Sequence, residues 1–237
     1  MRDERDAVRP VDAARIIAGR IADVLGDRLQ AAAVYGSAVT GDLLHGFSDL
    51  DLRLFVTNPV TVDDHLALRA ALSGSDLGGA AALQLSAAAA TPRPCFPPRT
   101  FRWVYGGGYG DAVVLDAGQL RAAGADWLAR LPGLLADDGL DWAAGTGADG
   151  RRQLRLLVTR LKPTVRAIIT AASDDPAFVW SAGWPDLTWR LAALDARLGA
   201  ALDAVLACLA EPGRDDDRAA AMTLRLLDSL VDGHRWR

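Results

Sequence analysis

The sequence predicts an α+β fold in two domains: a mixed sheet flanked by helices over residues 1–145, then a helical bundle over residues 146–237. Two observations lead to this prediction. Short apolar runs bounded by turn residues fill the first part of the chain, which is typical of strands. Beyond Gly150, apolar residues recur only at the spacing of a helix face. The Gly- and Asp-rich stretch before Gly150 is the expected boundary, because such segments commonly join domains.

The first domain is expected to contain two helices around its strands. Apolar residues at helical spacing predict a first helix over 10–29, which should pack on the sheet. A second helix is expected over 61–73. Thr61 is its expected N-cap, because a threonine hydroxyl can accept a hydrogen bond from the first turn. Residues 81–86 predict a short third strand.

A β-hairpin is expected to extend this sheet. Residues 99–105 and 111–115 are apolar runs on either side of a glycine-rich turn, so they predict two antiparallel strands. A helix should follow over 117–131. The second domain is expected to consist of helices over 151–172, 186–209 and 216–231.

The composition narrows the class of protein. Of the 237 residues, 51% are apolar and 24% charged, and the net charge is −4. No general affinity for nucleic acid or membranes is therefore expected. Cys95 and Cys208 do not make a disulfide framework, and the charged N-terminus lacks the apolar segment of a signal peptide. These features predict a cytoplasmic protein. The sequence does not fix the oligomeric state, and both a monomer and a homodimer are open.

Residues 34–56, VYGSAVTGDLLHGFSDLDLRLFV, organise the first domain. They predict an apolar strand, a turn at Gly36-Ser37, a short helical segment and a second strand. A glycine at such a turn lets the backbone approach a phosphate, and the N–H groups that open a helix favour anions. Gly36 and Ser37 are therefore candidate nucleotide-binding residues.

The second strand carries two acids, Asp49 and Asp51, separated by Leu50. Because side chains alternate along a strand, both carboxylates should leave on one face while Leu50 and Leu52 point into the core. Two oxygen ligands side by side suit a Mg²⁺ ion that also holds substrate phosphates. The alternative is a strand edge with solvated aspartates, which does not explain two carboxylates on one face of so apolar a strand.

Together these residues resemble the active-site signature of the polymerase-β-type nucleotidyltransferase superfamily: Gly-Ser, a spacer of about ten residues, then Asp-x-Asp. Ser48, directly before Asp49, strengthens the resemblance and joins Gly36 and Ser37 as a nucleotide-binding candidate. The resemblance implies that Asp49 and Asp51 are catalytic metal ligands. It also implies two Mg²⁺ ions and an NTP substrate, with ATP expected.

A third acid usually completes such a site. Asp111 follows a glycine-rich turn and begins an apolar run, whereas Asp116 stands at the expected N-cap of the next helix, so Asp111 is preferred. The runs YGGGYGDAVVLDAGQL at 105–120 and LLADDG at 134–139 resemble the aminoglycoside 6-adenylyltransferase (streptomycin-type) group. That resemblance implies that Asp111 is the remaining catalytic carboxylate and metal ligand.

Basic residues of the expected helix over 151–172 fall on one face. In related enzymes the C-terminal domain commonly supplies a cation to the triphosphate, and Lys162 is the preferred candidate here. The alternative is a solvated charged face, and Pro163 could interrupt the helix. The residues of this stripe are Arg151, Arg155, Lys162 and Arg166.

Three tryptophans, Trp180, Trp184 and Trp189, lie close together in the sequence. They could stack on a base or line a sugar pocket, or they could simply pack between helices.

The sequence thus predicts a Mg²⁺-dependent nucleotidyltransferase that moves NMP from an NTP to a hydroxyl of a small polar acceptor. An aminoglycoside-type antibiotic is the leading acceptor. Two alternatives are open: modification of a protein acceptor, as in two-component toxin–antitoxin nucleotidyltransferases, and a non-catalytic nucleotide-binding protein of the same fold.

Overall fold

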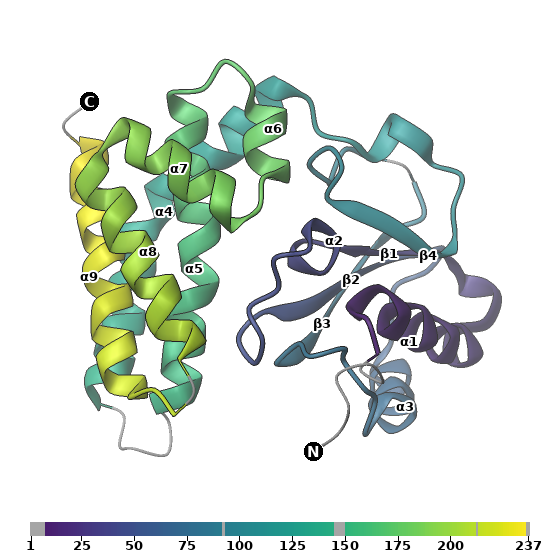
Figure 1. The fold of residues 1–237 in the computed structure, drawn as a ribbon. Helices are drawn as coiled ribbons and strands as arrows, with labels where there is room; N and C mark the ends of the chain where they lie inside the picture. The colour runs from purple at the N-terminus through teal and green to yellow at the C-terminus, as the bar shows by residue number, and fades with distance from the viewer. Residues whose placement is uncertain (1–7, 92, 145–149, 212, 236–237) are drawn as a thin grey trace. The chain divides into compact units, whose positions relative to one another are not determined.

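The computed structural model describes residues 8–91, 93–144, 150–211 and 213–235 (Figure 1). It divides into two compact units, Met1–Leu115 and Asp116–Arg237. The division falls at the start of helix α4 (Ala117–Ala144). The predicted boundary near residue 145 lies outside the described residues and stays a prediction.

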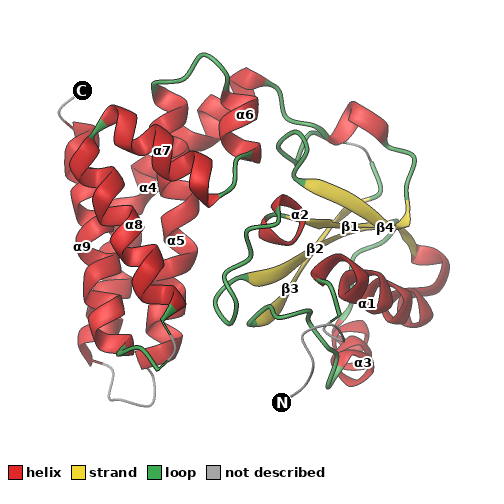
Figure 2. Ribbon diagram, in the orientation of Figure 1, coloured by secondary structure: helices red, strands yellow, loops and turns green. Residues whose placement is uncertain are grey.

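The first unit contains a four-stranded mixed sheet with the order β3-β2-β1-β4 (Figure 2). Strand β2 pairs with β1 in the antiparallel sense and with β3 in the parallel sense, and β4 pairs antiparallel with β1. The predicted mixed sheet is thereby confirmed. The strands are β1 (Leu29–Tyr35), β2 (Asp49–Val56), β3 (Ala82–Ala89) and β4 (Phe101–Gly106).

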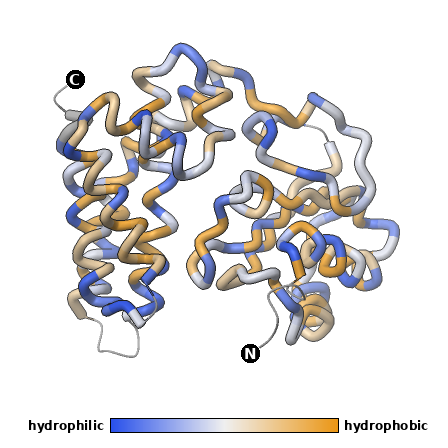
Figure 3. The backbone as a smooth tube through the Cα atoms, viewed as in Figure 1, coloured by the Kyte–Doolittle hydropathy of each residue, from blue (hydrophilic) through white to orange (hydrophobic). Residues whose placement is uncertain are grey.

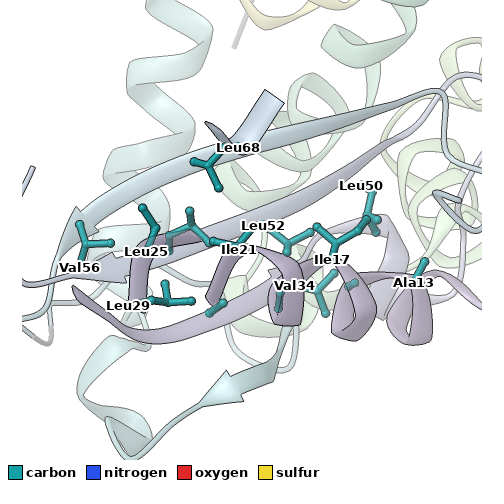
Figure 4. Packing of buried hydrophobic residues seen from close by; sticks show 14 residues of the cluster. Ala13, Ile17, Ile21, Leu25, Leu29, Val34, Leu50, Leu52, Val56 and Leu68 are labelled. Atoms are coloured by element: carbon teal, nitrogen blue, oxygen red, sulfur yellow. The ribbon is translucent and has the colours of Figure 1, made fainter. Parts of the chain in front are cut away.

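One face of the sheet is covered by two of the predicted helices, α1 (Pro10–Leu25) and α3 (Val62–Leu72). Figure 4 shows the α1 side chains Ile17 and Ile21 lying among sheet residues such as Leu52. All three side chains are fully buried. The apolar stripe read from the sequence is therefore what seats α1 on the sheet.

The start of α3 is fixed by its cap, as predicted. Asp64 N donates to Thr61 Oγ1 at 3.2 Å, and Thr61 N donates to Asp64 Oδ2 at 2.8 Å, which makes a capping box. Arg28, from the 3₁₀ helix η2 (Gly26–Arg28), also donates to the Asp64 carboxylate, so the cap is tied to the start of β1.

The opposite face is covered by a cluster of aromatic side chains. The rings of Phe96 and Phe101 stack with centroids 4.5 Å apart, and Phe55 lies 5.5 Å from Trp103. The small side chains of the central strand leave room for these rings. The cluster comprises Tyr35, Phe55, Phe96, Phe101, Trp103 and Tyr109.

The hairpin prediction is wrong. Strand β4 pairs with β1, and residues 110–113 form a 3₁₀ helix, η3 (Gly110–Val113). The backbone after η3 pairs instead with the proline-rich segment, where Leu115 N donates to Phe96 O at 2.8 Å. Val113 is fully buried in the aromatic cluster, which explains why this apolar run mimics a strand.

The described part of the second unit consists of helices joined by loops, and the alternating hydropathy in Figure 3 fits amphipathic helices. Helix α4 continues well past the predicted end at residue 131. Its Asp138 is buried and accepts a hydrogen bond from Arg160 Nε at 3.0 Å. The other helices are α5 (Gly150–Ala171), α6 (Pro176–Ser181), α7 (Trp184–Leu194), α8 (Ala196–Ala210) and α9 (Asp216–Arg235).

Two details of these helices differ from the prediction. The single helix expected over 186–209 is two helices, because Asp195 lies between them and caps α8 by accepting from Arg197 N at 2.8 Å. Helix α5 runs through Pro163 without a break. Across the described ranges, no helix combines the length and the apolar character needed to cross a bilayer.

Candidate functional site

The candidate site is built at the end of β1, where the strand turns into the short helix α2 (Ser37–Thr40). Gly36 makes this turn with φ 74° and ψ −143°, a backbone conformation that is costly for any residue with a side chain. Its N–H donates to Thr100 O at 2.9 Å, which anchors the turn to the segment before β4. Ser37 and Ala38 then present the first N–H groups of α2, which have no intrahelical partner.

Asp49 and Asp51 lie on β2 with the predicted alternation. Leu50 and Leu52 are fully buried on the helix-covered face, and the two carboxylates leave on the other face, where both are half-buried. Asp51 faces the Gly36 turn closely: a Cβ atom on residue 36 would lie 3.1 Å from Asp51 Oδ2. The structure thus brings together the glycine turn and the carboxylates that the sequence singled out.

Ser48 shapes the loop that leads into β2. Its hydroxyl oxygen accepts from Leu44 N at 2.9 Å, and its own N–H donates to Leu44 O at 2.9 Å. These bonds fix the backbone directly before Asp49. The assignment of Ser48 to nucleotide binding stays a prediction.

The electrostatics of the two carboxylates favour a cation. Burial, and secondarily the neighbouring Asp49, raise the pKa of Asp51 to about 7 from its usual 3.8. Burial, and secondarily the charge of Asp51, also raise the pKa of Tyr35, its cross-strand neighbour. Negative charge is therefore costly at Asp51, and a divalent ion bound there would remove that cost.

This donor set fits a magnesium ion. Mg²⁺ is usually held by one or two protein carboxylates, while waters and substrate phosphates complete its coordination. Asp49 and Asp51 supply two carboxylates from one strand face, beside N–H groups that suit phosphate oxygens.

Two neighbours on this face were missed by the sequence reading. The sheet register places Gln84 of β3 directly beside Asp51, and Ser86 beside Arg53. Arg53 Nε donates to Ser86 Oγ at 3.2 Å, so this basic side chain shares the face of the two aspartates. Strand periodicity alone could have found Arg53, two residues after Asp51. Gln84 required knowledge of the strand pairing.

Asp111 was predicted to complete the site with Asp49 and Asp51, but it does not lie beside them. It is exposed on η3, and in the part of the chain that the structure describes, no group of three or more His, Cys, Asp or Glu side chains could hold a metal. The expectation failed because it depended on the hairpin. Asp116 does cap the next helix as expected, since its carboxylate accepts from Gln119 N at 2.8 Å.

The basic stripe on α5 is not one uniform solvated face. Arg151 is exposed, but Arg166 is buried and donates to Ala182 O at 3.0 Å. The Lys162 ammonium lies 5.5 Å from the centre of the Trp184 ring. Lys162 belongs to the second unit, and its contact with a triphosphate stays a prediction.

The three tryptophans have different surroundings. Trp184 is buried, whereas Trp189 is 69% exposed. Trp189 also lines a pocket of about 420 Å³ between the end of α5 and α7, together with two acids and Arg190. The indole nitrogen of Trp180 is buried. The pocket lining is Ile169, Ala172, Ser173, Asp174, Asp175, Trp189, Arg190, Ala193 and Leu194.

Neither the family models nor the curated proteins give a match to this sequence.

Proposed function

We propose that the protein is a Mg²⁺-dependent nucleotidyltransferase that transfers NMP from an NTP, with ATP the expected substrate, to a hydroxyl of a small polar acceptor. The observation that carries the proposal is the approach of Gly36 to Asp51, with a would-be Cβ 3.1 Å from the carboxylate oxygen. The glycine turn proposed to bind phosphate therefore lies beside one of the two carboxylates proposed to bind the metal. This arrangement supports the proposal that the resemblance to polymerase-β-type nucleotidyltransferases extends to function.

Each residue has a defined task in this proposal. Asp49 and Asp51 would hold the metal, and the N–H groups at the start of α2 together with the Ser37 hydroxyl would hold phosphate oxygens. Bound Mg²⁺ would neutralise phosphate charge and orient the triphosphate. The acceptor oxygen would form a bond to the α-phosphorus as the bond to the bridging oxygen breaks. Pyrophosphate then leaves with that electron pair, and the hydroxyl proton passes to water.

Among the described residues of the second unit, the pocket beside Trp189 is a candidate location for an amine-bearing acceptor. The pocket beside Trp189 has the volume of a small-molecule site and contains Asp174 and Asp175. An exposed indole face and carboxylates suit a cationic ring, although Arg190 in the same lining opposes it. Aminoglycoside-type antibiotics carry several ammonium groups, so they are the first acceptors to test, with protein acceptors as the alternative.

The test begins with nucleotide binding. Titration calorimetry should show that Mg·ATP binds, that EDTA abolishes binding, and that Asp49→Asn or Asp51→Asn weakens it. Asp63→Asn, which removes an exposed carboxylate from α3, is the matched control and should leave affinity unchanged. Equal affinity in EDTA would refute the assignment.

Transfer is tested separately, with ATP labelled at the α-phosphate and a panel of aminoglycosides and candidate proteins. A labelled acceptor and released pyrophosphate are expected. One observation favours a second candidate, a nucleotide-binding protein without transferase activity: among the described residues, no third carboxylate stands beside Asp49 and Asp51. Metal-dependent ATP binding without any labelled acceptor would favour that candidate.

A further inference from the structure

The position beside Asp51 on the neighbouring strand is held by a neutral residue, Gln84. Strands β2 and β3 run parallel, and their register pairs Asp51 with Gln84 and Asp49 with Ala82. The Arg53–Ser86 hydrogen bond, two residues further along both strands, shows that these side chains leave on the same face. The buried Leu50, paired with Leu83, takes the opposite face.

This placement puts the Gln84 amide within reach of whatever Asp51 binds. Adjacent strands lie about 4.8 Å apart, and paired side chains on one face stand side by side. Gln84 is exposed, so its side chain can turn toward an ion or a phosphate at Asp51. On the other side, strand β1 places Tyr35 beside Asp51, so neither cross-strand neighbour of Asp51 carries a carboxylate.

The number of carboxylates limits the number of metal ions. In two-metal phosphoryl-transfer sites the ions lie about 3.5–4 Å apart, and each Mg²⁺ demands a near-octahedral set of oxygens. Two carboxylates can give one ion direct protein ligands. A second ion requires a further acid on the same face, and both cross-strand neighbours of Asp51 are neutral residues.

We infer that Gln84 occupies the place of a third carboxylate, so that the site binds one divalent ion with its nucleotide and not two. This inference rests on the proposed function. Gln84 is assigned as a positioning residue, whose amide contacts the phosphates or metal-bound water but supplies no charge. Conversion of Gln84 to an acid should therefore create a second metal site.

Mn²⁺ is the probe, because free and bound ions can be counted by electron paramagnetic resonance. The full-length protein is titrated with Mn²⁺ in the presence of a saturating, non-hydrolysable ATP analogue. Wild type should bind one ion per protein–nucleotide complex. Gln84→Glu should bind two ions per complex, because affinity for a divalent ion follows the number of charged ligands. Gln84→Asp repeats the test with a shorter side chain.

Gln30→Glu is the matched control. Gln30 is an exposed residue of β1 at the end of the strand away from the Gly36 turn, so this variant adds the same charge elsewhere and should still bind one ion. Two ions in the wild type, or unchanged stoichiometry and affinity in both Gln84 variants, would overturn the inference. If no variant binds the nucleotide at all, the proposed function itself has failed.

Discussion

Gly36 and Asp51 approach each other so closely that a Cβ atom on residue 36 would lie 3.1 Å from Asp51 Oδ2. Gly36→Ala should therefore displace the carboxylate as well as strain the backbone, whose φ of 74° favours glycine. The strain should cost about 1–3 kcal/mol of unfolding free energy. The crowding should weaken Mg·ATP binding by roughly tenfold or more, equivalent to about 1.4 kcal/mol.

Gly41→Ala separates these two effects. Gly41 also has a positive φ, 77°, but open space surrounds its would-be Cβ. This variant should lose stability in thermal melts and keep its Mg·ATP affinity in calorimetry. Equal losses of affinity in the two variants would show that strain alone, and not proximity to Asp51, explains the effect.

The raised pKa of Asp51 predicts a pH-dependent stability for the metal-free protein. Between about pH 4 and pH 7 the folded state holds a proton at Asp51 that the unfolded state has lost, so the free energy of unfolding should fall as pH rises through this window. In Asp51→Asn that group cannot titrate. At pH 8 the free energy of unfolding of the variant should be higher than that of wild type by on the order of 2 kcal/mol, after allowance for solvent contact. At pH 4 the two values should differ little. Urea unfolding at both pH values measures this, and a pH-independent difference would contradict it.

Metal binding should release protons near neutral pH. Asp51, with a pKa of about 7, is partly protonated there, and a cation can bind only the ionised carboxylate. The affinity for Mg²⁺ should rise as pH increases through 7, and the number of protons released should fall toward zero above about pH 8. Calorimetry in buffers with different ionisation enthalpies counts these protons. Constant affinity from pH 6 to 8 would exclude Asp51 as a ligand.

Asp111 and Asp116 should both be dispensable for nucleotide binding. Asp111→Asn should change neither affinity nor melting temperature, because the side chain is exposed on η3. Asp116→Ala should cost about 1 kcal/mol of unfolding free energy through the lost cap of α4, again with unchanged affinity. A transferase that is inactive only as Asp111→Asn would restore the original assignment of Asp111.

Lys162→Met tests whether Lys162 of the second unit contacts the triphosphate. The methionine keeps the apolar stem and removes the ammonium group that lies over Trp184, which should cost about 0.5–1 kcal/mol of unfolding free energy. If Lys162 also contacts the triphosphate, ATP affinity should fall while Mg²⁺ affinity without nucleotide stays constant. Unchanged ATP affinity would limit Lys162 to its packing role.

Local patterns in the sequence predicted those parts of the fold that depend on local physics. The apolar stripe of α1, the Thr61 cap and the alternation of Asp49 and Asp51 with buried leucines are all confirmed. Each depends on a helical or strand period, or on a hydrogen bond within one turn. The carboxylates and the Gly36 turn were found for the same reason.

Local patterns could not predict which distant segments of the chain pair with one another. The run around Val113 has the composition of a strand, but it pairs with a proline-rich segment and buries Val113 among aromatic rings. Asp138 looks like a turn residue until Arg160, from the next helix, pairs with it. Gln84 lies beside Asp51 only because β2 and β3 pair in parallel. Such facts depend on tertiary contacts, which override local preference.

The strand order has a consequence for the motions of the candidate site. Among the described strands, β1 and β2 lie inside the sheet, whereas β3 is at an edge and has a hydrogen-bonded neighbour on only one side. Amide hydrogens of the inner strands should exchange with solvent only through near-global opening, and the outward amides of β3 far faster, through local fraying. Asp51 and Gln84 therefore lie side by side on two strands whose backbone hydrogen bonds open at different rates. A bound ion that contacts both should slow deuterium uptake along β3 and leave uptake along β1 unchanged.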